Sequence, residues 1–173
     1  MPGMANTNTP QDLILSPHFK LSELTLSQAA VRHGVGNTPN PEQLANLYRT
    51  AAMLEQVRAL LGNKPLVISS GFRSAAVNSL VGGSLKSAHL LGLAADFTCP
   101  SFGTPQQVCR AIVASGLAFD QCIYEGTWVH LAAPPNCDAA AFADIDPASC
   151  RRSVLTARFT PGGPTRYVQG VVA

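Results

Sequence analysis

Two histidines and one aspartate are the residues of this chain best suited to hold a catalytic metal ion. His89 and Asp96 stand seven residues apart, and His130 follows in Thr127-Trp-Val-His-Leu131. Two imidazoles and one carboxylate, with a fourth position left for water, form the ligand set of a catalytic zinc. The three residues therefore predict a Zn²⁺ centre and a hydrolase that works through a zinc-activated water.

Composition limits the other classes of function. The chain has 173 residues, of which 46% are hydrophobic, so it fits one domain with a continuous core, with or without extensions. Its 12 basic and 10 acidic residues leave a net charge of +2, too small for a broad field that would hold nucleic acid or an anionic membrane. No apolar run approaches the roughly 18 residues of a membrane span. We expect a monomer with no nucleic-acid partner.

The first ten residues lack the basic and apolar regions of a secretory signal, so we expect the protein to stay in the cytoplasm after synthesis. The five cysteines form an odd set without C-x-x-C spacing, which argues against a disulfide framework and a Cys-type zinc site. Cys99, Cys109 and Cys122 sit in apolar surroundings and are expected to be buried thiols. Cys137 and Cys150 flank a stretch of small residues, so a bridge between these two remains an alternative.

Two helices are expected to form the scaffold. Asn40 is a suitable N-cap, Pro41 fits the first helical position and Gln43 can complete a capping box, which predicts a long helix that ends near Gly62. Thr104 followed by proline repeats this signature and predicts a second helix to about residue 115. A short helix is expected over 75–80.

The predicted strands explain how the three candidate ligands could meet. Strands are expected over 66–70, 93–98, 120–124 and 127–131, with two more over 153–159 and 165–172 that show no evident chemistry. Because side chains alternate along a strand, Asp96 and His130 can point from the same face of a sheet. Gly92 would allow the tight turn that brings His89 to Asp96. The spacing of His89 and Asp96 alone would also fit a hydrogen-bonded structural histidine.

A series of short motifs surrounds these residues in a fixed order. They are Ser69-Ser-Gly-Phe-Arg-Ser74, Asn78, Val81-Gly-Gly-Ser84, Ser87-Ala-His89, Gly92-Leu-Ala-Ala-Asp-Phe97, Phe119-Asp-Gln-Cys-Ile-Tyr-Glu125 and Trp128-Val-His130. Together they resemble the zinc D-Ala-D-Ala carboxypeptidase family, and more specifically its short phage and bacterial members that cut peptidoglycan stem peptides. The resemblance runs from about Pro17 through Leu131. It implies an α+β fold of the hedgehog and D-Ala-D-Ala peptidase type, with a small antiparallel sheet and packed helices, and a zinc held by His89, Asp96 and His130.

The catalytic base departs from the pattern of this family. In many members it is an acidic residue three positions before the last histidine ligand, and here that position is Thr127, which cannot accept a proton. A carboxylate must take the proton of the attacking water and return one to the leaving amine. Glu125 is our first choice, with a solvated turn carboxylate as its alternative role. Asp120 is the second candidate, and could instead be structural.

Three further residues are candidates for the site, and the resemblance supports the first of them, Arg73. Arg73 would bind a substrate carboxylate or the developing oxyanion, although an ion pair that holds its turn is the alternative. Ser87 would hydrogen-bond the substrate or a metal ligand. Trp128 lies on the same side of its strand as His130, so it would either form a wall of the substrate cleft or pack in the core.

We expect a flexible leader over 1–15, a zinc peptidase core over 16–135 and a C-terminal extension over 136–173 that packs on or completes the same domain. The expected activity is hydrolysis of amide bonds in peptidoglycan stem peptides, as a D-Ala-D-Ala carboxypeptidase or as an endolysin-type endopeptidase. Such an enzyme would reach the cell wall through phage lysis or carriage in a virion. The alternative is a non-catalytic zinc-containing module that binds the cell wall or serves a structural role, a function favoured by Thr127.

Overall fold

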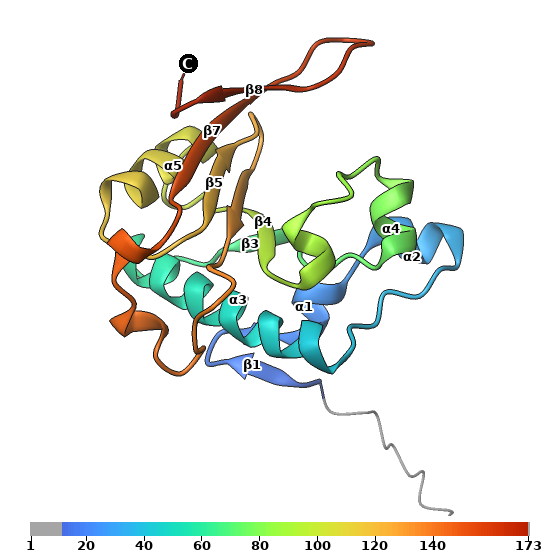
Figure 1. Ribbon diagram of the computed structural model, residues 1–173, viewed down its shortest axis with the longest axis horizontal. Helices are drawn as coiled ribbons and strands as arrows, with labels where there is room; N and C mark the ends of the chain where they lie inside the picture. Colours follow the sequence, from blue (N-terminus) through green and yellow to red (C-terminus); the bar gives the residue numbers. More distant parts are fainter. Residues whose placement is uncertain (1–11, 173) are drawn as a thin grey trace, which may run out of the picture.

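A six-stranded sheet with helices packed against it forms the centre of the computed structural model, which describes residues 12–172 (Figure 1). The strands are β1 (Ile14–Ser16), β2 (Phe19–Lys20), β3 (Val67–Ser70), β4 (Ala94–Thr98), β5 (Gln121–Tyr124), β6 (Val129–Ala132), β7 (Ser153–Arg158) and β8 (Arg166–Gln169). The α-helices are α1 (Leu21–Thr25), α2 (Gln28–His33), α3 (Pro41–Leu60), α4 (Ala75–Leu80) and α5 (Pro105–Ala114). Three short 3-10 helices are η1 (Ala88–Leu91), η2 (Phe142–Asp144) and η3 (Pro147–Ser149). The predicted α+β class is confirmed.

The sheet has the strand order β3-β4-β6-β5-β7-β8. All neighbouring strands are antiparallel except β5 and β7, which are parallel. The prediction of a small antiparallel sheet therefore holds for β1 and β2, which pair separately, and for the four strands from β3 to β5. The parallel attachment of β7 makes the larger sheet a mixed one.

The two main helices begin where the sequence predicts. The Asn40 side chain accepts a hydrogen bond from the Gln43 backbone N–H, and the Gln43 side chain accepts one from the Asn40 N–H, both at 2.8 Å. Thr104 and Gln107 form the same reciprocal pair at the start of α5. Each box satisfies backbone N–H groups that the first helical turn leaves without partners.

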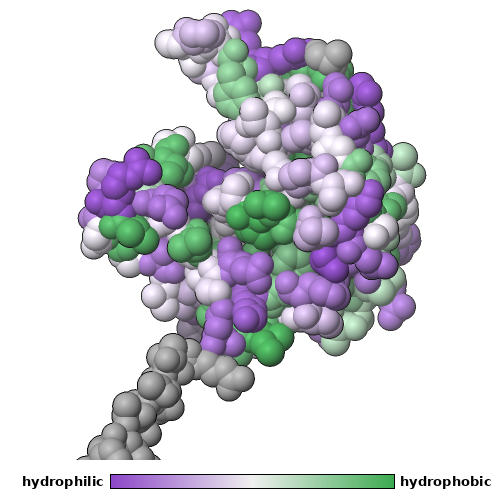
Figure 2. Space-filling model, turned by 180° about the vertical axis from the view of Figure 1, so that it is seen from behind, coloured by the Kyte–Doolittle hydropathy of each residue, from purple (hydrophilic) through white to green (hydrophobic). Residues whose placement is uncertain are grey.

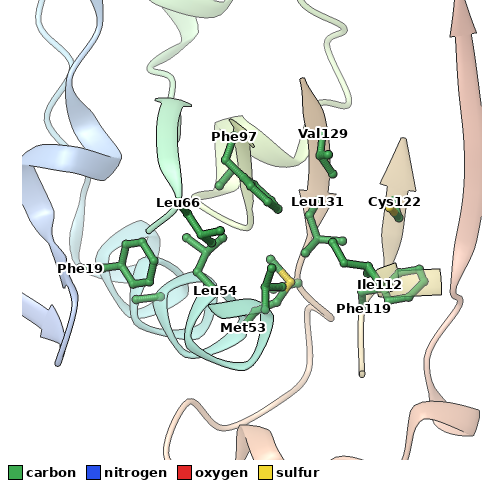
Figure 3. Close-up of a cluster of buried hydrophobic side chains, with 14 of the residues drawn as sticks. Phe19, Met53, Leu54, Leu66, Phe97, Ile112, Phe119, Cys122, Val129 and Leu131 are labelled. Atoms are coloured by element: carbon green, nitrogen blue, oxygen red, sulfur yellow. The ribbon is translucent and has the colours of Figure 1, made fainter. Parts of the chain in front are cut away.

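The hydrophobic core occupies one face of the sheet. Phe97, Val129 and Leu131 extend from β4 and β6 toward Met53 and Leu54 of α3 (Figure 3). All five are fully buried. Because side chains alternate along each strand, this arrangement leaves the opposite face of β4 and β6 to Asp96 and His130.

The N-terminal segment holds the connection between β3 and α4. The Phe72 backbone N–H donates to the carbonyl oxygen of Leu24 in α1 at 2.7 Å. The Asn37 side chain donates to the carbonyl oxygens of Thr25 and Phe72, at 2.7 and 3.0 Å, and accepts from the Ser74 N–H at 2.7 Å. These contacts fix the short segment that carries Arg73.

The two segments expected to flank the peptidase core are the leader and the C-terminal extension. Of the expected leader, residues 1–11 lie outside the described part, and β1 begins at Ile14. The C-terminal residues contribute η2, η3, β7 and β8, and β7 pairs with β5 in the central sheet.

All five cysteines are free thiols, so Cys137 and Cys150 are not bridged. None of the helices in residues 12–172 combines the length and apolar character needed to cross a membrane.

Polar side chains of α3 hold the turn between η1 and β4. Gln43 and Asn46 donate side-chain hydrogen bonds to the carbonyl oxygens of Leu90 and Leu91, at 2.9 and 2.8 Å, and the Thr50 hydroxyl donates to that of Gly92 at 2.8 Å. Gly92 has φ +74°, and a Cβ there would lie 2.6 Å from the carbonyl oxygen of Gln43. The turn predicted at Gly92 is thus confirmed, and close approach to α3 requires glycine there.

Replacing Gly92 with alanine should therefore destabilise the protein more than the same change at Gly62. Gly62 has a similar φ of +75° but open space around the added Cβ, so both variants share a left-handed penalty of about 1–2 kcal/mol. Overpacking against the α3 backbone should cost G92A about 1–3 kcal/mol more. Urea unfolding measures the difference in the free energy of unfolding, and equal losses in the two variants would contradict this account.

Candidate metal centre

Three potential ligand atoms converge at one point of the sheet face opposite the core. Asp96 and His130 are directly opposite each other in the register of β4 and β6, and His89 reaches them from η1. Asp96 Oδ1 lies 2.9 Å from His130 Nδ1 and 3.1 Å from His89 Nε2, and the two nitrogens are 3.1 Å apart. A tetrahedral ion with bonds of about 2.0–2.1 Å separates its ligands by about 3.3 Å. The spacing of the three atoms thus fits zinc.

The orientation of His89 is set by the backbone of the β3–α4 connection. Its Nδ1 lies 2.6 Å from the carbonyl oxygen of Gly71, which can only accept a hydrogen bond, so Nδ1 carries the proton and Nε2 presents a lone pair. A Cβ at Gly71 would lie 2.3 Å from the carbonyl oxygen of Leu24. Glycine therefore lets β3 end against α1 with its carbonyl group directed at His89.

In this tautomer His89 Nε2 and Asp96 Oδ1 are both hydrogen-bond acceptors, and they face each other. Burial lowers the pKa of His89, which favours the neutral imidazole, even though the charge of Asp96 acts in the opposite direction. The lone pair of His89 Nε2 then lies 3.1 Å from a carboxylate oxygen with no proton between them. A cation between the two atoms converts this repulsion into coordination. The chemistry of the donor set therefore fits zinc as well as its spacing does.

Asp96 is buried as a charged group. Burial alone would raise its pKa, but the electrostatic influence of the neighbouring His89 and His130 outweighs burial, so the pKa of Asp96 lies well below its ordinary value. Its second oxygen, Oδ2, accepts a hydrogen bond from Arg73 Nη2 at 2.6 Å, and Arg73 Nε donates to the Ser70 hydroxyl at 2.9 Å. Arg73 thus forms an ion pair with one of the candidate metal ligands.

The two candidate bases lie in different surroundings. Glu125 follows β5 in the hairpin that delivers His130, and its pKa is raised, first by burial and then by the charge of Asp96. Asp120 forms an ion pair with Arg151 through both oxygens, at 2.9 and 2.5 Å. Glu125 lines the same cleft as the three candidate ligands, whereas both carboxylate oxygens of Asp120 accept hydrogen bonds from Arg151.

The ligands line a cleft of about 820 Å³, a volume typical of ligand sites. Its lining includes Ser87 and Lys86, together with Phe159 just after β7 and Tyr167 of β8. Trp128 lines the cleft and lies near Phe159, with ring centroids 6.5 Å apart. Figure 2 shows the surface hollowed between the projecting β7–β8 hairpin and the lobe that contains α4.

Sequence reasoning thus placed Trp128 and Ser87 at the site but missed the two aromatic residues of the hairpin. Strands were predicted at both positions, and alternation could have indicated which side chains share a face. No local signal indicated that this hairpin joins β5 and thereby reaches the cleft.

Comparison with known proteins agrees with the geometry. The model of the family described as Peptidase M15 matches residues 17–132. The zinc D-Ala-D-Ala carboxypeptidase of Streptomyces albus G is 42% identical over 59 residues, which cover 34% of this chain and 23% of that relative. The chain therefore matches less than a quarter of this relative's length. The resemblance drawn from the motifs is confirmed at the level of the family, and β7 and β8 lie beyond the matched residues.

Metal analysis should find about one zinc per chain, and H89A or H130A should lose it, because each removes one of three ligands. His33, the last residue of α2, provides a matched control, since H33A removes an exposed imidazole far from the centre in sequence. Zinc should also raise the melting temperature of the wild type and of H33A. Full zinc content in both H89A and H130A would refute the assignment.

Proposed function

Because this chain belongs to the peptidase M15 family, we propose that it is a zinc-dependent peptidase that hydrolyses amide bonds in peptidoglycan stem peptides. The observation that carries the proposal is the convergence of His89 Nε2, Asp96 Oδ1 and His130 Nδ1 within 3.1 Å of one another in a cleft. The relative from Streptomyces albus G is named for zinc and for D-Ala-D-Ala, the terminus of such peptides. Its name supports this class of substrate.

The residues around the ligands supply the remaining chemistry. When bound, zinc polarises the scissile carbonyl and lowers the pKa of a water molecule in its open position. Glu125 takes the proton of the attacking water and transfers it to the departing amine. A pKa raised by burial suits a carboxyl group to both steps, since it binds the proton more firmly than a solvated carboxylate and can still release it.

Arg73 combines two tasks. Its bond to Asp96 Oδ2 holds the carboxylate so that Oδ1 faces the two histidines. The contacts to Asp96 and Ser70 leave further N–H groups of the guanidinium, which has five donors, and Arg73 lines the cleft. These free donors can bind a substrate oxygen or the oxyanion that develops during attack.

The shape and charge of the cleft suit a peptide substrate whose carboxylate lies near the bond to be cleaved. Arg73 and Lys86 bring positive charge to the side formed by the 81–88 segment, and the cleft continues past the ligands to the C-terminal hairpin. A peptide can therefore extend on both sides of the ligands. Removal of a terminal D-Ala and endolysin-type cleavage within the stem are the two forms of the proposed activity.

Zinc-loaded protein should release new amino groups from purified peptidoglycan or free D-Ala from a stem peptide that ends in D-Ala-D-Ala. Free D-Ala identifies a carboxypeptidase, and new amino groups without free D-Ala identify an endopeptidase. A chelator should abolish the release and added zinc should restore it, because the chemistry requires the metal. A zinc-loaded protein that leaves both substrates intact would refute the peptidase and favour the non-catalytic zinc module.

Substitution of Glu125 by Gln should lower kcat about 100-fold or more while zinc content stays unchanged, because the amide cannot accept the proton. E42Q, on the exposed first turn of α3, is the matched control for loss of a carboxylate charge and should retain full activity. D120N should stay within a few-fold of the wild type. The opposite pattern, an active E125Q and an inactive D120N with zinc retained, would make Asp120 the base.

A further inference from the structure

The register of the central sheet places a tyrosine of the last strand on the face that holds the metal ligands. Successive register partners across β4, β6, β5 and β7 are Asp96, His130, Ile123 and Leu155. Ala157 lies two residues after Leu155 and therefore on the same face, and it pairs with Tyr167 of β8. Tyr167 thus shares a sheet face with the centre although it lies at the far edge of the sheet.

The side chain of Tyr167 reaches the same cleft as the ligands. It lines this cleft together with Glu125 and the metal ligands. Burial, followed by the charges of Glu125 and Asp96, raises the pKa of Tyr167, so its phenol stays neutral at physiological pH and keeps its proton to donate. The residue is 53% exposed, which leaves room for a ligand to approach the hydroxyl.

The hairpin that carries Tyr167 is anchored at its base. The Thr156 hydroxyl donates to the carbonyl oxygen of Gly170 at 2.7 Å and accepts from the Val172 N–H at 3.0 Å. The side chain of Gln106 in α5 donates to the carbonyl oxygen of Val172 at 3.2 Å. From this base the hairpin projects beyond the rest of the sheet (Figure 1). Its position beside the cleft is therefore fixed by the sheet and by α5.

The wall that this hairpin forms is aromatic. Phe159, just after β7, approaches Trp128, which precedes the strand of His130. The indole N–H of Trp128 is buried and has no hydrogen-bond partner among the described residues. Aromatic surfaces with polar tips can pack against a peptide while they hydrogen-bond its backbone. Trp128, Phe159 and Tyr167 thus give the cleft an aromatic surface that can pack against a peptide.

We propose that Tyr167 contacts the substrate and that its hydroxyl donates a hydrogen bond to an acceptor oxygen of the bound peptide. The inference rests on the proposed peptidase function and adds to it a specificity determinant outside residues 17–132, the part of the chain that matches the family. The β7–β8 hairpin forms the wall of the cleft from which this contact is made.

The test compares Y167F with Y124F. Tyr124 is the last residue of β5, directly before Glu125. Its side chain lies on the sheet face opposite Tyr167 and packs against the core, so Y124F removes a hydroxyl without touching the cleft. Y167F should lower kcat/KM for the stem peptide about 5- to 10-fold, the loss expected for one hydrogen bond. Y124F should equal the wild type. Both variants should keep their zinc and their melting temperature.

A binding measurement separates this contact from turnover. In zinc-loaded E125Q, calorimetry should show that adding Y167F weakens binding of the uncleaved stem peptide, whereas adding Y124F leaves the Kd unchanged. Wild-type protein that cleaves no peptide would refute the proposed function itself. If the wild type is active and Y167F matches Y124F in kcat/KM and Kd, the role of Tyr167 is overturned and the peptidase stands. A loss in Y167F accompanied by lost zinc or a lower melting temperature would also overturn it.

Discussion

The centre depends on three electron-pair donors that the fold holds close together. A buried carboxylate is costly unless charges and hydrogen bonds surround it; Arg73 donates to one oxygen of Asp96, and the other oxygen faces the two imidazoles. The proton of His89 is committed to the Gly71 carbonyl, so its other nitrogen can only present a lone pair toward Asp96. A zinc ion would remove this conflict, and a large part of the fold holds the three donors in place.

The surrounding fold fixes the position of each candidate ligand through contacts to its backbone or to neighbouring backbone groups. Asp96 and His130 are fixed by the pairing of β4 with β6, two central strands whose opposite faces pack on α3. His89 has no strand to hold it, and the polar side chains of α3 fix η1 instead. The N-terminal segment contributes through Leu24, which approaches Gly71 so closely that only glycine fits. The segment before α3 is thus as much a part of the centre as the strands are.

Local chemistry explains which features could be predicted from the sequence. The capping boxes at Asn40 and Thr104 lie within four residues and can be read directly, and strand alternation suffices to place Asp96 and His130 on one face. The attachment of β7 to β5 depends on a parallel pairing between segments about 30 residues apart, for which the sequence contains no comparable local signal. For the same reason the ion pair of Asp120 with Arg151 could not be foreseen, and Asp120 stood beside Glu125 as a candidate base.

The order of the strands separates the candidate ligands of the central strands from the residues of the C-terminal hairpin. The candidate ligands lie on β4 and β6 and next to β4, in the part that matches the family, whereas Phe159 follows β7 and Tyr167 lies on the edge strand β8. β5 separates β6 from β7, so a substitution on the hairpin can change a wall of the cleft without altering the register of Asp96 with His130. Effects of distant sites without shared partners are nearly additive. In the proposed peptidase, the C-terminal hairpin would therefore tune which peptides bind while the central strands keep the chemistry fixed.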